Sequence, residues 1–127
     1  MLKKTKGSQR KDLRKILDRV HSRLIRHIYG NVCVVCGSTE NIECGHIFKR
    51  EGDATRWDIA EDGDCHPQCH NCNAKHEGDR APYDNWYIEK FGQMRFDNLR
   101  RRHGSIMKLA DSDLKAMITS FESQMST

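Results

Sequence analysis

Apolar residues between Arg10 and Tyr29 recur at steps of three and four, which is the period of an α-helix. The pattern predicts an amphipathic helix that ends at Gly30. Its apolar face holds Leu13, Ile16, Leu17, Val20, Leu24 and Ile28. Its opposite face is basic and holds Lys11, Arg14, Lys15, Arg19, Arg23 and Arg26.

Residues 31–72 break the helical period and are rich in Gly, Asp, Asn and Cys, a composition typical of turns and short strands. Two segments favour strands, Glu43–Arg50 and Asp64–Gln68. A short helix follows from about Asn71 to Glu77 and ends at Gly78. The pattern therefore predicts the order strand, loop, strand, helix.

Three further helices are predicted in the last part of the chain. Pro82–Phe91 begins with a proline, which suits a first turn, and Gly92 ends it. Gln93–Arg102 forms the next helix and has a basic end. The last begins at Asp111 or Ser112, either of which is a favourable N-cap residue. It buries Leu114, Met117, Ile118, Phe121 and Met125.

The apolar core that these elements can build is small. The 127 residues fit a single folding unit, and the hydrophobic fraction is 36% against 31% charged residues. The hydrophobic fraction is low for a globular domain, so we expect another interaction to stabilise the fold. No stretch approaches the roughly 18 apolar residues that would span a membrane, and the N-terminus lacks the apolar run of a signal peptide.

The cysteines supply that stabilisation if they bind zinc. Two CxxC pairs, Cys33 with Cys36 and Cys69 with Cys72, can present four thiolates to one tetrahedral ion. A redox-active dithiol is the alternative, although one such motif would suffice for redox chemistry. Cys44 and Cys65 do not fit this tetrahedron, and we expect them to be small buried hydrophobes on the adjacent strands. The alternative for these two is an exchange with one of the four ligands.

The net charge of +4 conceals a strong asymmetry. Residues 1–30 carry ten Lys or Arg against two acidic residues, a charge of +8. Residues 31–80 carry five basic and ten acidic residues, a charge of −5. The basic arm suits the phosphate backbone of DNA, and an acidic middle near nucleic acid usually needs cations. The other interpretation of the arm is a solvated helix face with a disordered tail.

The predicted order of strand, loop, strand and helix between the two CxxC pairs is the ββα-metal arrangement. The chain here resembles the HNH nucleases and, among them, the NinG (Rap) family of lambda-type phage recombination proteins. The shared pattern is a CxxCG, a GH pair, a TRWD-like stretch, an HxQCxxCN, a glycine and a PY. These motifs are Cys33 to Gly37, Gly45-His46, Arg56-Trp57-Asp58, His66 to Asn73, Gly78 and Pro82-Tyr83.

Hydrolysis of a phosphodiester needs a base and a divalent ion. His46 is the candidate base because an imidazole titrates near neutral pH. The resemblance implies a metal-ligand role for Asn73, and His76 lies one helical turn further on. Asp64 stands where the middle Asn of the HNH pattern usually lies, and it either orients His46 or binds the ion. Gly45 replaces the acidic ligand that many HNH enzymes have just before the base.

His66 is either a further group supporting the ion or phosphate, or a packed structural histidine. Arg56 is the candidate phosphate clamp because its guanidinium can pair two oxygens, with a structural salt bridge as the alternative. Trp57 is expected in the core. The expected DNA-binding residues are Arg14, Arg19, Arg23, Arg50 and Arg56.

Together these features predict an α+β fold, with a zinc-stapled ββα-metal (HNH) core between an N-terminal basic helix and C-terminal helices. The segments are 1–32 (basic tail and helix), 33–80 (nuclease core) and 81–127 (helical region). We expect a DNA endonuclease with structural Zn²⁺ and catalytic Mg²⁺ or Mn²⁺, cytoplasmic in a bacterial or phage-infected cell. The resemblance implies branched DNA as substrate, and a homodimer through the apolar helices is expected. The alternative is a non-catalytic, zinc-stabilised DNA-binding module.

Overall fold

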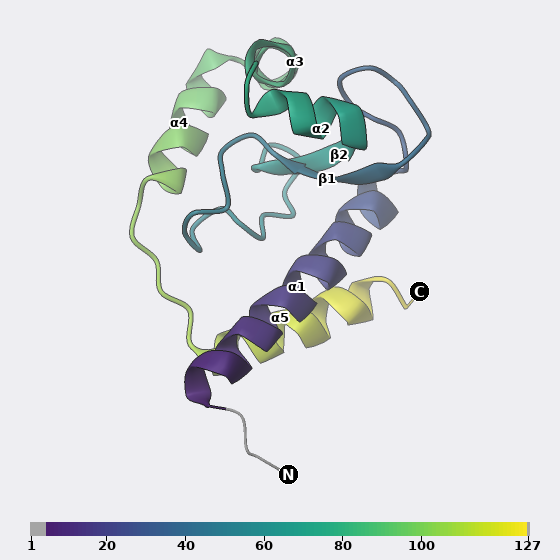
Figure 1. Cartoon of the computed structure of the whole chain (residues 1–127). Coiled ribbons are helices and arrows are strands. Elements are labelled where there is room, and N and C mark those ends of the chain that lie inside the picture. The colour runs from purple at the N-terminus through teal and green to yellow at the C-terminus, as the bar shows by residue number, and fades with distance from the viewer. Residues whose placement is uncertain (1–4, 127) are drawn as a thin grey trace.

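The computed structural model describes residues 5–126, so Lys3 and Lys4 of the basic tail lie outside the described part. Within it the chain forms five helices and one two-stranded sheet, an α+β fold (Figure 1). No helix in the described range is both long and apolar enough to cross a membrane. The elements are α1 (Lys6–Tyr29), β1 (Ile42–His46), β2 (Cys65–Cys69), α2 (His70–His76), α3 (Ala81–Phe91), α4 (Gln93–His103) and α5 (Asp111–Gln124).

Helix α1 ends where the sequence predicts but begins four residues earlier. Thr5 caps it by accepting a hydrogen bond from the backbone N–H of Ser8 at 3.0 Å. The polar first turn has no apolar period, so the pattern alone could not locate the start. At the other end Gly30 adopts a positive φ of 89°, a conformation that favours glycine.

The two strands form an antiparallel hairpin in which His46 pairs with Cys65 and Gly45 pairs with His66. Strand β1 is shorter than predicted because the chain turns away after His46, and β2 has the predicted length but lies one residue further along the chain. A Cβ at Gly45 would lie 1.8 Å from the side-chain oxygen of Gln68, so glycine here leaves room for the buried Gln68 side chain.

Two hydrophobic clusters lie on opposite sides of this hairpin. Helix α1 covers the face that carries Cys44, His46 and Cys65, and α3 contacts the face of Gly45 through Tyr83. The first cluster joins α1 to α5 and comprises Leu17, Val20, Leu24, Trp57, Leu114 and Phe121. The second joins α3 and α4 to the end of β1 and comprises Ile47, Phe48, Tyr83, Tyr87, Phe96 and Leu99. Trp57 is therefore a core residue, as expected.

Helices α1 and α5 pack side by side in the same direction (Figure 1). Arg10 contacts Asp111 near the start of both, and the rings of His21 and Phe121 lie 5.9 Å apart further along. The apolar faces from which a homodimer was expected thus bury each other within one chain. Ile16 and Ile28 of α1 stay 38% and 44% exposed, and the homodimer remains a prediction.

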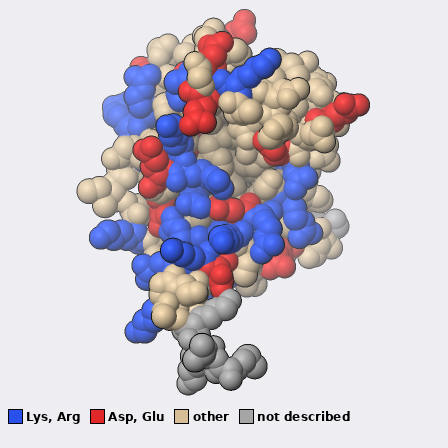
Figure 2. Space-filling view, viewed as in Figure 1, with Lys and Arg blue, Asp and Glu red and all other residues tan. Residues whose placement is uncertain are grey.

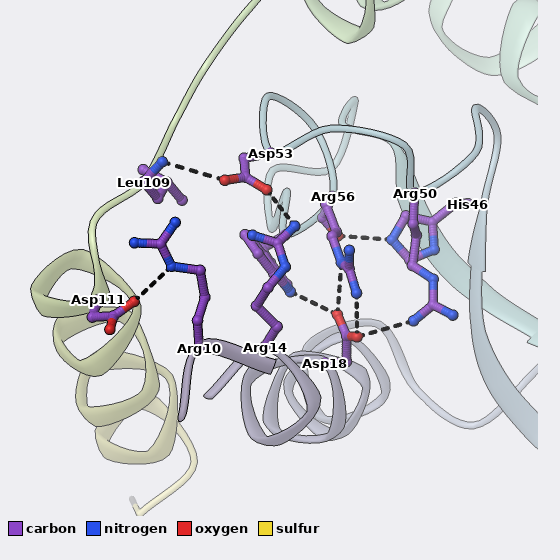
Figure 3. A network of polar contacts seen from close by, with 10 residues as sticks. Arg10, Arg14, Asp18, His46, Arg50, Asp53, Arg56, Leu109 and Asp111 are labelled. Carbon is purple, nitrogen blue, oxygen red and sulfur yellow. Dashed lines mark hydrogen bonds and ion pairs between the residues drawn. The ribbon is translucent and has the colours of Figure 1, made fainter. Parts of the chain in front are cut away.

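The loop between the strands is fastened to α1 through Asp18 (Figure 3). This carboxylate accepts hydrogen bonds from Arg56 at 3.0 and 2.6 Å and from the indole N–H of Trp57 at 2.8 Å. Burial alone would raise the pKa of Asp18, but the hydrogen bonds from Arg56 and Trp57 hold it below its usual value. The same loop is held again by the ion pair of Arg14 with Asp53.

We predict that Asp18→Asn lowers the free energy of unfolding by about 2 kcal/mol at pH 7, because it leaves the largely buried Arg56 guanidinium without a charged partner. The pKa of Asp18 is lower in the folded state than in the unfolded state. The stabilisation by the Asp18 carboxylate is therefore present above pH 3.8 and is lost as the pH falls through the pKa of the folded state. Urea unfolding at pH 7 and pH 3 should show the difference between wild type and variant shrinking at the lower pH.

Glu61→Gln is the matched control. Glu61 forms an ion pair with Lys90 in which the Glu61 side chain is 63% exposed and the Lys90 side chain 49% exposed. Such a surface pair contributes about 0.5 kcal/mol or less. Equal urea midpoints for wild type and Asp18→Asn at pH 7 would contradict the prediction.

Candidate metal centre and adjoining pocket

The four cysteines of the CxxC pairs come together at the base of the hairpin. Their sulfurs all lie within 4.8 Å of one another, and those of Cys36 and Cys69 are 3.7 Å apart. Four thiolates around zinc at 2.3 Å are about 3.8 Å apart, so the spacing fits a tetrahedral zinc ion. The predicted grouping is confirmed, and its donor chemistry suits a closed structural metal site.

Tight turns place these sulfurs. Gly37 follows the first pair with a φ of +79° and donates a backbone hydrogen bond to the carbonyl of Cys33 at 2.9 Å. The second pair spans the end of β2 and the first turn of α2, where the backbone N–H of Cys72 points at the Cys69 sulfur at 3.4 Å. Burial alone would raise the pKa of Cys33, but backbone hydrogen bonds lower it to about 7. The local backbone thus favours the thiolate form of Cys33, whereas burial and the neighbouring cysteines raise the pKa of Cys72.

A pocket of about 540 Å³ lies beside this centre, between α1, β1 and α2. It brings together His46, Asn73 and His76, three residues that the sequence assigned to one site. Basic side chains contribute to its wall, as an anionic substrate would require. Its charged lining residues are Glu43, Lys49, Arg50, Glu77 and Arg80.

Glu43 is a pocket residue that the sequence analysis missed. The amide nitrogen of Asn73 donates a hydrogen bond to its carboxylate at 2.7 Å, and His70 lies 3.3 Å from its other oxygen. This hydrogen bond uses the amide nitrogen of Asn73 and does not involve its amide oxygen. Glu43 lies two residues before Gly45, on the same face of β1. That face therefore has a carboxylate although Gly45 lacks one, and this alternation was the signal available in the sequence.

His46 borders the pocket, but its ring is held on the side of the sheet that faces α1. Its Nε2 lies 2.7 Å from the backbone carbonyl of Arg56, and its ring centroid is 6.0 Å from that of His21. A carbonyl only accepts, so Nε2 carries the proton and Nδ1 keeps its lone pair. Burial lowers the pKa of His46. The ring is thus fixed in orientation with one nitrogen free to accept a proton or bind a metal.

His76 is buried at the pocket edge, with 8% of its surface exposed. Its Nε2 donates to the backbone carbonyl of Ile47 at 2.8 Å, and its Nδ1 has no hydrogen-bond partner among the described residues. The helical position predicted for His76 is confirmed. Its Nδ1 therefore carries a lone pair close to the pocket, as the Nδ1 of His46 does.

Two other predicted residues lie away from the pocket. His66 is buried between the hydroxyl of Tyr83 and the carbonyl of Glu61, at 2.8 and 2.7 Å, and burial lowers its pKa to about 4. This is the packed structural histidine of the two alternatives. Asp64 is fully buried and accepts hydrogen bonds from the backbone of Phe48 and the hydroxyl of Thr55, at 2.8 and 2.9 Å. Burial raises the pKa of Asp64 to about 8, and its carboxylate holds the loop.

The arginines expected to bind DNA fall into two groups. The guanidinium groups of Arg14, Arg50 and Arg56 form ion pairs with acidic residues of the same chain (Figure 3). Arg56 is also only 16% exposed, so the salt-bridge alternative describes it better than a phosphate clamp. Arg19 and Arg23 are exposed on α1. Figure 2 shows Lys and Arg gathered in a band across the face over α1, interrupted by acidic groups.

Comparison with known protein families decides the affiliation. The family model described as Bacteriophage Lambda NinG protein matches residues 1–127, which is the whole chain. The chain belongs to the bacteriophage lambda NinG family. Neither a curated protein nor a solved structure matches it. Membership of the NinG family suggests a role related to phage recombination.

We predict that Cys69→Ser removes one equivalent of tightly bound zinc per chain and lowers the melting temperature, because binding energy at such a site is also folding energy. Metal analysis of protein purified without chelator, followed by thermal unfolding, measures both. The control is Asn71→Ala, an exposed residue between the two cysteines of the pair that offers no thiolate. Unchanged zinc content in Cys69→Ser would contradict the assignment.

Proposed function

We propose that the protein is a metal-dependent HNH-type endonuclease that hydrolyses phosphodiester bonds in branched DNA recombination intermediates. The observation that carries the proposal is the pocket between β1 and α2, where Glu43 and Asn73 are in contact next to the four-cysteine centre. The order of two strands and a helix agrees with the ββα-metal arrangement that the sequence predicts.

Glu43 and Asn73 are suited to hold the catalytic ion. A carboxylate and an amide oxygen are hard donors, the type that Mg²⁺ and Mn²⁺ prefer. An ion bound there supplies Lewis-acid stabilisation of charge on the scissile phosphate and leaving oxygen. The position of Asn73 is fixed by Cys72, the preceding residue, so a structural centre at the cysteines would also hold the ligand in place.

Basic side chains at the pocket orient the DNA backbone. Lys49 lines the pocket and can pair with phosphate oxygens. Arg50 and Arg80 line it too, and each would have to exchange its ion pair, with Asp18 or Asp84, for a phosphate. Ser22 of α1 also lines it, and Arg19 lies one helical turn before Ser22. The exposed basic face of α1 therefore continues from the pocket along a path that a DNA strand could follow.

The sequence predicts His46 as the general base of this reaction. The carbonyl of Arg56 holds its Nε2–H and leaves Nδ1 as the proton acceptor. Because its ring also lies against His21, replacing it would disturb more than water activation. Glu43 and Asn73 are cleaner probes of the reaction.

A non-catalytic, zinc-stabilised DNA-binding module is the second candidate. It is favoured by the internal partner of His46, which holds the side chain that a nuclease would use as its base. The two functions differ in whether DNA is cut. The branched substrate follows from the role suggested by family membership.

We predict that the wild type cleaves a four-way junction in Mg²⁺ or Mn²⁺ faster than a flap or a linear duplex. Asn73→Ala and Glu43→Gln should each reduce the cleavage rate by at least about 100-fold, because each removes an ion ligand. Raising the metal concentration should partly restore Asn73→Ala, since mass action offsets weakened affinity.

The matched controls are Asn98→Ala on α4 and Glu40→Gln, an exposed glutamate outside the pocket, and both should cleave like the wild type. Absence of cleavage by the wild type with either ion, together with intact junction binding, would favour the binding module instead.

A further prediction concerns the face of α1. Replacing Arg19 and Arg23 by Gln should weaken DNA binding and lower the slope of log K against log salt by about 0.9 for each duplex phosphate that is no longer neutralised. Fluorescence anisotropy at several salt concentrations measures the slope. Lys115→Gln, on the exposed side of α5, should leave it unchanged. An unaltered slope in the double variant would mean that this face is only solvated.

A further inference from the structure

A second group of metal-binding side chains lies where α1 covers the hairpin, and three of its four members also line the pocket described above. It comprises His21, Cys44, His46 and Cys65, whose donor atoms all lie within 4.8 Å of one another. They come from α1, β1 and β2. This group shares no residue with the four-cysteine centre. Three elements that are distant in the sequence thus present two imidazoles and two thiols to one point.

The two histidine rings are oriented as metal ligands usually are. The Nε2 of His21 lies 2.7 Å from the carbonyl of Asp58, and the Nε2 of His46 lies 2.7 Å from the carbonyl of Arg56. Both carbonyls belong to the loop between the strands. Each fixes the proton on Nε2 and leaves Nδ1 as the free lone pair. A histidine that binds metal commonly donates its other N–H to a backbone carbonyl in this way.

The thiols of the cluster have only weak hydrogen-bond contacts, and the Cys65 sulfur donates to the carbonyls of Thr55 and Arg56 at 3.8 and 3.6 Å. The sulfur of Cys44 lies 4.0 Å from the Nδ1 of His21, which is a long contact for a weak donor. In a tetrahedral zinc site with Zn–S near 2.3 Å and Zn–N near 2.05 Å, this separation is about 3.6 Å. A shift of a few tenths of an ångström would bring the contact to that value.

Burial makes the arrangement costly without a ligand. His21 is 1% exposed and Cys65 is not exposed at all. The Nδ1 of His21 has exchanged water for the distant Cys44 thiol, which is not an equal replacement. A metal ion would satisfy both Nδ1 atoms and both sulfurs at once.

We propose that His21, Cys44, His46 and Cys65 form a second, closed zinc site that ties α1 to the hairpin. Cys44 and Cys65, expected to be small buried hydrophobes, become ligands together with His21, which the sequence analysis missed. His46 becomes a ligand through Nδ1 instead of the general base. The inference does not depend on the proposed nuclease function, since it concerns how much metal the fold holds.

Metal content of the full chain tests the site. Protein purified without chelator should hold two equivalents of zinc, and Cys65→Ser and His21→Ala should each hold one. Cys69→Ser should also hold one, and the double variant Cys65→Ser/Cys69→Ser none. His21→Cys should keep two equivalents, because a thiolate can replace the imidazole in a tetrahedral site. Retention of the four-cysteine zinc in Cys65→Ser shows that a single loss is local and not a failure to fold.

Cobalt provides a second readout. Co²⁺ in Cys69→Ser should give the visible absorption of a tetrahedral site with two thiolates, and in Cys65→Ser that of a site with four. His46→Ala separates the two roles of this residue. If His46 is a zinc ligand, the variant should hold one equivalent of zinc. If it is only the general base, the variant should still hold two equivalents and lose only cleavage activity. One equivalent of zinc in the wild type, two equivalents in Cys65→Ser, or a Cys44–Cys65 disulfide by mass spectrometry would overturn the proposal.

Discussion

The two-stranded hairpin is the constraint on which the other elements depend. Strands of five residues cannot form a stable sheet alone in water, so the pair persists only if both faces and both ends are held from outside. Helix α1 covers one face and α3 the other. The four cysteines close one end, and Asp18 draws the loop at the other end onto α1. The pocket lies where α1, β1 and α2 meet.

The sequence predicted most of the elements and little of their mutual attachment. The helices and the hairpin follow from local periods, and the paired cysteines indicate their own convergence. The partner of Arg56 lies 38 residues away at Asp18, and no local pattern could show that it would be bound internally. The choice between the two roles of His66 was decided by Tyr83 and Glu61, which only the folded chain brings to its ring.

His21 shows why a periodic pattern can hide chemistry. It occupies the buried stripe of α1 between Leu17 and Leu24, where any residue type is first interpreted as packing. Only the pairing of β1 with β2 places Cys44 and Cys65 against it. Glu43 was missed for a related reason. An acidic ligand is expected directly before His46, at the position of Gly45. The carboxylate of Glu43 instead lies two residues before Gly45, on the same face of β1.

The parallel packing of α1 and α5 affects when the molecule can complete its core. Arg10 and Asp111 are 101 residues apart in sequence, so this contact closes almost the longest loop that the chain allows. During synthesis, α1 leaves the ribosome long before the residues that cover it. Its apolar face must remain uncovered, or be shielded by a chaperone, until residues 111–124 arrive. A chain interrupted before that point would contain the hairpin and the cysteines but would expose Leu17 and Leu24 to solvent and to association with other chains.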